Sequence, residues 1–182
     1  KRSPQSETDE KYSSNYYAKS KLKLSNYLRK IYKKKRFPFI VLRLYQVYGP
    51  YQKKNRLIPF VIDSCIKNRK FPCSDGKQIR DFLYIDDLSN LILNIINRTY
   101  IKSKFYNIGT NKPKSVRNVI NLISKIVKKG KPEFGKKNMR KDEILKLYPN
   151  IRRVVTELKW KPNIKLKTGL KRTINFYKKI DY

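Results

Sequence analysis

The sequence contains no histidine, one alanine (Ala18), two cysteines and only six glycines. Histidine is the commonest protein ligand of transition metals, and Cys65 and Cys73 do not have the spacing of a zinc-binding pair. We therefore expect no metal site. Two unpaired thiols are typical of a protein in a reducing compartment, so we also expect a cytoplasmic location.

No long hydrophobic run is present either. A helix that spans a membrane needs about 18 or more apolar residues in succession, and no stretch approaches that length, so we expect no membrane association. Lys1-Arg2-Ser3-Pro4 is followed by polar residues and not by the apolar segment of a signal peptide. The only methionine is Met139, so we expect the chain to begin inside a longer protein.

Acidic residues are scarce: 13 face 46 basic residues, and the net charge is +33. Such an excess is one mark of a nucleic-acid-binding module, which we keep as an alternative function. Abundant lysine, asparagine, isoleucine and tyrosine beside a single alanine is also the profile of an AT-rich coding sequence. The lysines are spread along the chain, and no zinc-finger or RNA-recognition motif occurs, so we expect no specific nucleic-acid partner.

Helical and extended patterns alternate along the 182 residues, which are enough for one domain with a real core. Alternating strands and helices predict an α/β fold. Pro38 should end the first helix, and Asp86 and Ser115 should cap two others. We expect helices over 15–34, 58–67 and 168–179. Two more helices should begin at Asp86 and Ser115, and another should follow Pro149 and end near Trp160. We expect strands over 39–45 (buried), 71–73, 79–84 and 105–108, and a basic turn over 128–132.

Tyr17 and Lys21 lie four residues apart in the first predicted helix, so their side chains should share one face. A nearby ammonium group favours the ionised form of a phenol, whose pKa is ordinarily about 10, and so can produce a general base. The same spacing also arises by chance in a lysine-rich chain, as in Tyr100 to Lys104. Spacing alone leaves a catalytic and an incidental reading open.

Several stretches in order resemble the extended short-chain dehydrogenase/reductase family, specifically the nucleotide-sugar epimerases and dehydratases. The most specific block, from Asp75 to Leu88, resembles the family's Gly-x-x-x-Arg-Asp-(aromatic)-x-x-Val-x-Asp motif. The other matching blocks are Tyr17-Ala-Lys-Ser-Lys21, Leu42 to Pro50, Arg56-Leu-Ile-Pro59, Tyr106-Asn-Ile-Gly109 and Leu158 to Pro162. Together they cover about residues 15–180.

The resemblance implies a catalytic role for the first pair. Tyr17 would remove a proton from a sugar hydroxyl while NAD, or NADP, takes the hydride from the same carbon. Lys21 would bind the nicotinamide ribose and lower the pKa of the tyrosine. Leu44 and Tyr45 would lie against the nicotinamide, although packing at the end of a strand explains them equally well. Epimerisation, dehydration and reduction all stay open.

The resemblance also implies a site for a nucleotide-diphosphate sugar. Arg80 and Arg140 would grip the diphosphate, a task suited to a planar, permanently charged guanidinium group. An ion pair between Arg80 and Asp81 is the alternative for the first arginine. For Arg140 the alternative is a solvated surface position.

Five further positions are implied on the substrate side. Arg56 and Leu57 would approach the nucleotide, Glu143 would meet its ribose, and Phe71 begins a segment that would lie beside the base. Phe71 is equally compatible with a core strand. Gln46 stands where the family usually has asparagine, so a sugar preference does not carry over.

The resemblance predicts the C-terminal part of a Rossmann-type doubly wound parallel sheet plus a small α/β substrate-binding lobe. Residues 1–50 would end the NAD-binding domain, and 51–182 would be mainly the substrate lobe, with 77–109 partly returning to the sheet. None of the glycines has the Gly-x-x-Gly-x-x-Gly spacing of the cofactor loop. We therefore expect a fragment that is inactive alone, with NAD bound largely by a missing N-terminal part. A non-catalytic remnant is the alternative, and a full-length enzyme would be a homodimer.

Overall fold

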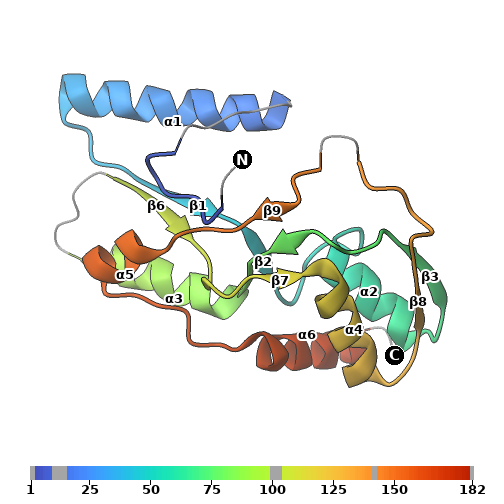
Figure 1. Ribbon diagram of the computed structural model, residues 1–182. Coiled ribbons are helices and arrows are strands. Elements are labelled where there is room, and N and C mark those ends of the chain that lie inside the picture. Colours follow the sequence, from blue (N-terminus) through green and yellow to red (C-terminus); the bar gives the residue numbers. More distant parts are fainter. Residues whose placement is uncertain (1–2, 10–15, 99–103, 141–142, 181–182) are drawn as a thin grey trace.

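The computed structural model describes residues 3–9, 16–98, 104–140 and 143–180, and it confirms the α/β class (Figure 1). The helices are α1 (Tyr16–Lys35), α2 (Leu57–Ile66), α3 (Ile85–Ile96), α4 (Val116–Val127), α5 (Arg152–Leu158) and α6 (Leu166–Ile180). The strands are β1 (Ile40–Leu44), β2 (Gln46–Tyr48), β3 (Lys70–Cys73), β4 (Ile79–Arg80), β5 (Phe82–Tyr84), β6 (Lys104–Ile108), β7 (Lys114–Ser115), β8 (Lys131–Phe134) and β9 (Lys146–Leu147).

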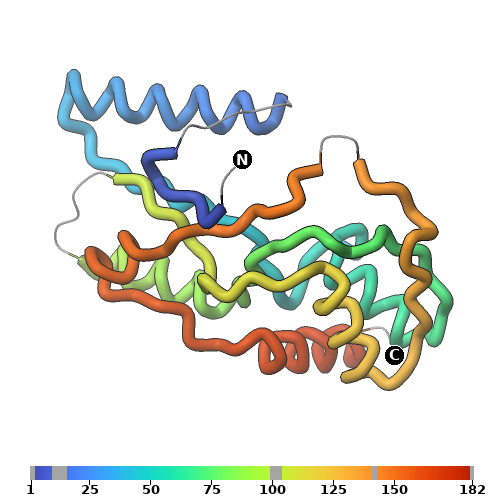
Figure 2. Tube along the Cα trace, in the orientation of Figure 1, coloured from blue at the N-terminus to red at the C-terminus, as the bar shows by residue number. Residues whose placement is uncertain are grey.

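Parallel pairings between distant segments organise the chain. β1 pairs with β6 from Ile40 opposite Lys104 to Leu44 opposite Ile108, and β2 pairs with β5. β3 pairs with β8 in the same sense, while β4 lies between antiparallel β7 and parallel β9. Figure 2 shows the light-blue β1 running beside the yellow-green β6. The pairings thus bring the end of β1 and the start of β2 close to β5 and β6, which lie about 40 to 60 residues later in the sequence.

Two hydrophobic cores support these strands. The larger one joins α2, α4 and α6 to β2, β3 and β5, with Val61, Ile123 and Leu170 fully buried among others. The smaller one packs α3 and α5 around β5 and β6, with Leu83, Leu91 and Val154 at its centre. Ser115 caps α4 as predicted, since its Oγ accepts the N–H of Asn118 at 3.1 Å. Among the described helices, none is both long and apolar enough to cross a membrane.

β1 is not the buried strand that the sequence predicts. Its residues are half-buried, and Leu44 is 46% exposed. The reason is that, among the described residues, β1 has a strand partner only in β6, and α1 contributes no buried residue to cover it. Figure 1 shows α1 at the margin of the molecule, joined to the rest through β1. The extended segment also breaks at Tyr45, after which Gln46–Tyr48 turns to pair with β5.

One further local prediction is wrong and another is partly correct. Tyr84, in an extended conformation, is the N-cap of α3 without a side-chain cap, and Asp86 instead lies in the first turn and pairs with Arg172 at 3.2 Å. A carboxylate there still interacts favourably with the helix dipole. The basic turn expected over 128–132 is present at Lys128 and Gly130, which both have positive φ, but Lys131 and Pro132 begin β8, where parallel pairing with β3 satisfies the backbone groups. The two cysteines are free and buried, as expected.

Asp81 joins β4 and β5 to the segment that follows β6. Its backbone carbonyl accepts the N–H of Gln46 at 3.1 Å, and its Oδ1 accepts the N–H of Thr110 at 2.7 Å. The residue is fully buried, and Oδ2 has no hydrogen-bond partner within the described part of the chain. Burial raises the pKa of Asp81 despite the N–H groups that it accepts.

Gly169 permits the close approach of α6 to β2 and β5. A Cβ atom at this position would overlap Tyr48 Oη and lie 2.8 Å from Tyr84 Cδ2. We expect Gly169→Ala to lower the free energy of unfolding by about 1–2 kcal/mol, because overpacking outweighs the better helix propensity of alanine. Urea denaturation measures this, with Thr168→Ala on the exposed side of the same helix as the control. Equal stability of the two variants would contradict the prediction.

Asp81 should make stability depend on pH in a defined direction. Since its folded-state pKa is raised above the usual 3.8, its contribution to the free energy of unfolding falls as the pH rises from there through the folded-state pKa. Denaturation of the wild type and Asp81→Asn below about pH 4 and near pH 7 should show the wild type losing stability relative to the variant at the higher pH. A constant or opposite difference would exclude this role.

Candidate functional site

A pocket of about 640 Å³ opens between α2, the segment from β3 to β4, the start of α4 and the chain after β8. It contains five of the residues predicted from the sequence, Gln46, Leu57, Arg80, Arg140 and Glu143. They come from four separate segments, because Arg140 and Glu143 belong to the same loop, and the strand pairings described above bring these segments together. The pocket is therefore a product of the tertiary structure and not of any one motif.

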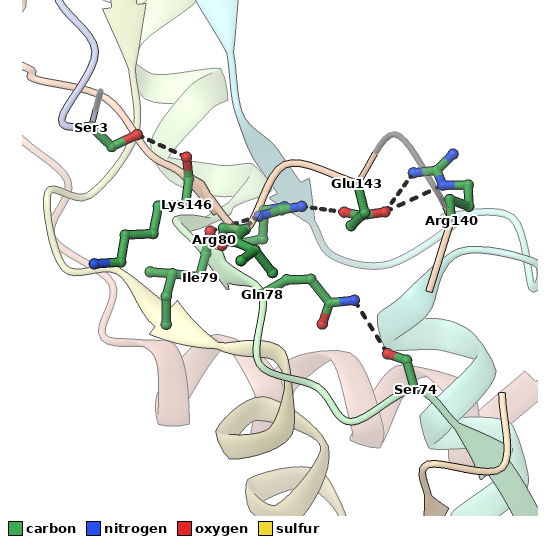
Figure 3. Close-up of polar contacts among 9 residues, drawn as sticks. Ser3, Ser74, Gln78, Ile79, Arg80, Arg140, Glu143 and Lys146 are labelled. Carbon is green, nitrogen blue, oxygen red and sulfur yellow. Dashed lines mark hydrogen bonds and ion pairs between the residues drawn. The ribbon is translucent and has the colours of Figure 1, made fainter. Parts of the chain in front are cut away.

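An ion-pair network of two arginines and one glutamate forms one wall of this pocket (Figure 3). The Arg80 side chain is 8% exposed, and its guanidinium group donates to a carboxylate oxygen of Glu143. The other oxygen of Glu143 accepts from Arg140 Nε at 3.2 Å and Nη2 at 3.1 Å. Burial lowers the pKa of Arg80, and the charge of Glu143 raises it. Two arginines thus share one carboxylate, which leaves a net positive charge in this wall.

The alternative prediction, an ion pair between Arg80 and Asp81, is wrong. Successive residues of an extended chain project to opposite sides, so Arg80 reaches Glu143 while Asp81 reaches Thr110. The alternative for Arg140 is partly correct, because its side chain is 81% exposed although it contacts Glu143. Arg80 is consequently a buried cation of the pocket wall, and Arg140 is an exposed cation at its rim.

A second pocket of about 260 Å³ adjoins the first through Gln46 and Arg80, which line both. Leu44 and Tyr45 line it, so the two residues predicted on the cofactor side lie next to those predicted on the substrate side. Tyr45 Oη donates to Gln5 Oε1 at 3.1 Å, and burial raises the pKa of Tyr45 to about 12. This phenol stays protonated at neutral pH and serves as a hydrogen-bond donor.

Two predicted substrate-side residues lie outside these pockets. Arg56 precedes α2 and lines a smaller neighbouring pocket of about 200 Å³, which also meets Gln46. Phe71 is 2% exposed and packs edge-on against Phe60 at 5.9 Å, so its side chain belongs to the core. Only the two residues after it, Pro72 and Cys73, line the large pocket.

Tyr17 and Lys21 share one face of α1, as their spacing predicts. Lys21 Nζ lies 5.4 Å from the centroid of the Tyr17 ring, and Tyr17 is 72% exposed. Neither residue lines any of the three pockets that meet at Gln46. The structure thus assembles the pair itself but leaves it open to solvent.

Among the residues that line these pockets but were not predicted from the sequence are Gln5, Gln78 and Asn138. Gln5 faces Tyr45 from a polar, turn-like segment that carries no motif, so nothing in the sequence singles it out. Gln78 is buried in the large pocket, where its Nε2 donates to Ser74 Oγ at 3.2 Å. Its place two residues before Arg80, in the most specific sequence block, was a usable signal. Asn138, in the loop after β8, had none.

Comparisons with known proteins identify the family and the fold of this chain. The model of the NAD dependent epimerase/dehydratase family matches residues 1–109. CDP-abequose synthase of Salmonella muenchen is 32% identical over 139 residues, which are 75% of this chain and 47% of that protein. A putative UDP-glucose 4-epimerase of Methanocaldococcus jannaschii is 33% identical over 170 residues, 91% of this chain and 52% of that protein. The chain spans about half the length of the curated relatives it matches.

Solved structures confirm the Rossmann-type fold. UDP-glucose 4-epimerase of Thermotoga maritima superposes with a TM-score of 0.91 at 24% identity, over 100% of this chain and 59% of that one. dTDP-glucose 4,6-dehydratase of Bacillus anthracis, solved with NAD, gives a TM-score of 0.85 at 27% identity, over 95% of this chain and 55% of that one. The matched family model, the relatives and the assembled pocket agree. The chain belongs to the NAD dependent epimerase/dehydratase family.

Proposed function

We propose that this chain is the catalytic-helix and substrate-binding part of an NAD(P)-dependent nucleotide-sugar epimerase or dehydratase. The observation that carries the proposal is the large pocket in which Gln46, Leu57, Arg80, Arg140 and Glu143 converge. Solved relatives hold UDP-glucose, or UDP-glucuronic acid together with NAD. A pocket of this size with a cationic wall suits a nucleotide diphosphate joined to a sugar.

The diphosphate would lie against the Arg80–Glu143–Arg140 wall. Arg80 is held by Glu143 and by its bond to the carbonyl of Ile79 at 2.8 Å, so it loses little conformational entropy on binding. Arg140 can move to the phosphate from its exposed position. The nucleoside would extend toward Leu57 and Cys73, and the sugar toward Gln46, where the two pockets join.

The proposed chemistry begins with proton removal by Tyr17. Its Oη accepts the proton of a sugar hydroxyl as the hydride on the same carbon leaves, so that a ketone forms. Bound NAD or NADP supplies the hydride acceptor. Lys21 lies beside Tyr17 and would hold the ribose hydroxyls, while Leu44 and Tyr45 would flank the nicotinamide. The exposed position of Tyr17 fits a base that becomes enclosed only when the cofactor-binding half covers α1.

The domain division is part of the proposal. Residues 1–50 would complete a cofactor-binding domain, and 51–182 would form mainly the substrate lobe, with 77–109 partly in the sheet. The half-exposed β1 fits a strand that pairs with further strands of such a domain. We also propose a homodimer, since Tyr16, Leu24 and Tyr27 leave an exposed apolar surface on α1. A cytoplasmic location agrees with two free buried thiols.

A second candidate is a chain that binds nucleotide sugars without turning them over. Tyr17 is exposed, and β1 has one strand partner within the described part of the chain, which favours this candidate for the 182 residues alone. Both candidates predict the same ligand and differ only in catalysis. A nucleic-acid-binding module stays an untested prediction, and family membership makes it the weaker one.

Arg80 should control the affinity for the nucleotide sugar. We expect Arg80→Gln to weaken the binding of UDP-glucose or dTDP-glucose by about 10- to 100-fold, the usual value of a hydrogen bond to a charged group. Arg140→Gln should have a smaller effect because its side chain is exposed. Isothermal titration calorimetry measures both. Arg172→Gln, which removes an exposed arginine of α6, is the control. Unchanged affinity in a folded Arg80→Gln variant would refute the assignment.

Tyr17 and its neighbour provide a matched test of catalysis. In a protein that joins this chain to a complete NAD site, we expect Tyr17→Phe to lower kcat by about 10²- to 10⁴-fold with little change in KM, because only the acid–base group is lost. Tyr16→Phe makes the same chemical change at a side chain that is 90% exposed and should leave kcat unaltered. Equal losses in both variants would mean that the helix, and not the phenol, is responsible.

A further inference from the structure

A separate pocket of about 400 Å³ lies at the opposite end of β1 from Gln46. Its cations are Arg29, Lys30 and Lys33 of α1, Lys104 of β6 and Arg153 of α5. Its aromatic residues are Tyr32, Phe39 and Phe105. We call this set of residues the basic pocket. It shares no residue with the three pockets that meet at Gln46, and five residues of strand, about 16 Å, separate the two ends of β1.

The floor of the basic pocket is a rigid cluster of rings. Tyr32 and Phe39 meet edge-on with centroids 6.0 Å apart, and Phe39 meets Phe105 in the same way at 5.4 Å. Phe105 is buried in β6. Edge-to-face ring pairs of this kind hold their geometry well. The cations above the floor are therefore mounted on an ordered base.

Three arginines are held around Phe105. The guanidinium carbons of Arg29 and Arg43 lie 4.5 and 4.8 Å from the ring centroid, and Arg153 Nη1 donates to the Phe105 carbonyl at 3.3 Å. Arg43 is fixed by a further bond to the carbonyl of Glu7 at 3.0 Å. Arginine does not relieve repulsion by losing its proton near neutral pH. Burial lowers the pKa of Arg43, and the charge of Arg29 lowers it further.

The positive charge of the basic pocket is not neutralised by the described residues. Five cations line it and no carboxylate does. The nearby carboxylate of Glu157 accepts from Lys104 at 2.7 Å and from Tyr106 Oη at 3.0 Å, so it offsets at most one of the five charges. Fixed like charges over an apolar floor are favourable only when an anion offsets them.

We propose that the basic pocket binds a small molecule that carries two or more linked phosphate groups. Planar guanidinium groups of Arg29 and Arg153 suit bidentate contacts to phosphate oxygens, and Lys30, Lys33 and Lys104 add point charges around them. The volume accommodates a triphosphate, and the ring floor offers an apolar surface to any attached group. Inorganic polyphosphate and a nucleoside triphosphate share this chemistry.

Such a ligand would also fasten α1 to the rest of the molecule. α1 has no buried residue, and it carries both three cations of the basic pocket and, about three turns earlier, Tyr17 and Lys21. An anion bound between Arg29 on α1 and Arg153 on α5 would bridge the helix to the second core. Binding is therefore expected to order the helix that holds the proposed catalytic pair. This inference stands apart from the proposed function, because it concerns binding at another site.

The test is calorimetric titration of the full chain with inorganic tripolyphosphate at physiological salt. All proteins carry Arg80→Gln, so that Arg140 is balanced by Glu143 and the wall of the large pocket loses its net positive charge. We expect Arg29→Gln with Lys33→Gln to weaken binding at least 10-fold, and Arg153→Gln, from a different helix, to weaken it similarly. Lys23→Gln with Lys34→Gln removes the same charge from exposed positions of α1 outside the pocket and should leave the affinity within about 2-fold.

Hydrogen exchange supplies a second readout. Tripolyphosphate should slow amide exchange in α1 of the protein with an intact basic pocket, and not in the Arg29→Gln, Lys33→Gln variant. Tighter binding of ATP than of tripolyphosphate would identify a nucleotide as the natural source of the phosphates, and equal binding would identify inorganic polyphosphate. Equal weakening by the pocket and control variants, or no change in α1 exchange, would overturn the proposal, because binding would then follow net charge alone.

Discussion

Arg80 and Asp81 are adjacent buried charges that point to opposite sides of one extended segment, and much of the molecule is arranged around them. Arg80 faces the large pocket and joins β4 to Glu143, while Asp81 faces the sheet and joins β5 to the chain after β6. Each charge has a hydrogen-bond partner, since burying an unpaired charge would cost several kcal/mol. Side-chain alternation along the strand thus separates a ligand-facing cation from a structural anion.

The same segment links the two cores. β5 follows Asp81 and contributes Leu83 to the smaller core and Phe82 to the larger one. Its pairing with β2 places Gln46 between the two adjoining pockets. A nucleotide sugar that reaches both pockets would therefore lie beside β2 and β5, where the two hydrophobic cores meet. α1 is the exception to this tight arrangement, because it contributes no buried residue and depends on few contacts.

The proposed activity distributes its parts unequally over the described structure. The proposed substrate side is a pocket in which Arg80 is held by Glu143. The catalytic pair is exposed, although its internal spacing is correct. A buried arginine in the pocket wall and a solvent-exposed tyrosine fit an enzyme whose cofactor-binding half would cover α1. An anion in the basic pocket would join the helix that carries this tyrosine to α5.

Local patterns determined a large part of this protein. Apolar periodicity, Pro38 and Ser115 predicted the helices and the main strands, and the ordered blocks predicted the family and five residues of the large pocket. Only the tertiary structure decided that Arg80 pairs with Glu143, 63 residues away, that Phe71 points into the core, and that Gln5 meets Tyr45. Short-range preferences encode periodicity and caps. The partner of a charge and the exposure of a strand depend on which distant segments pack together, and only folding brings those segments into contact.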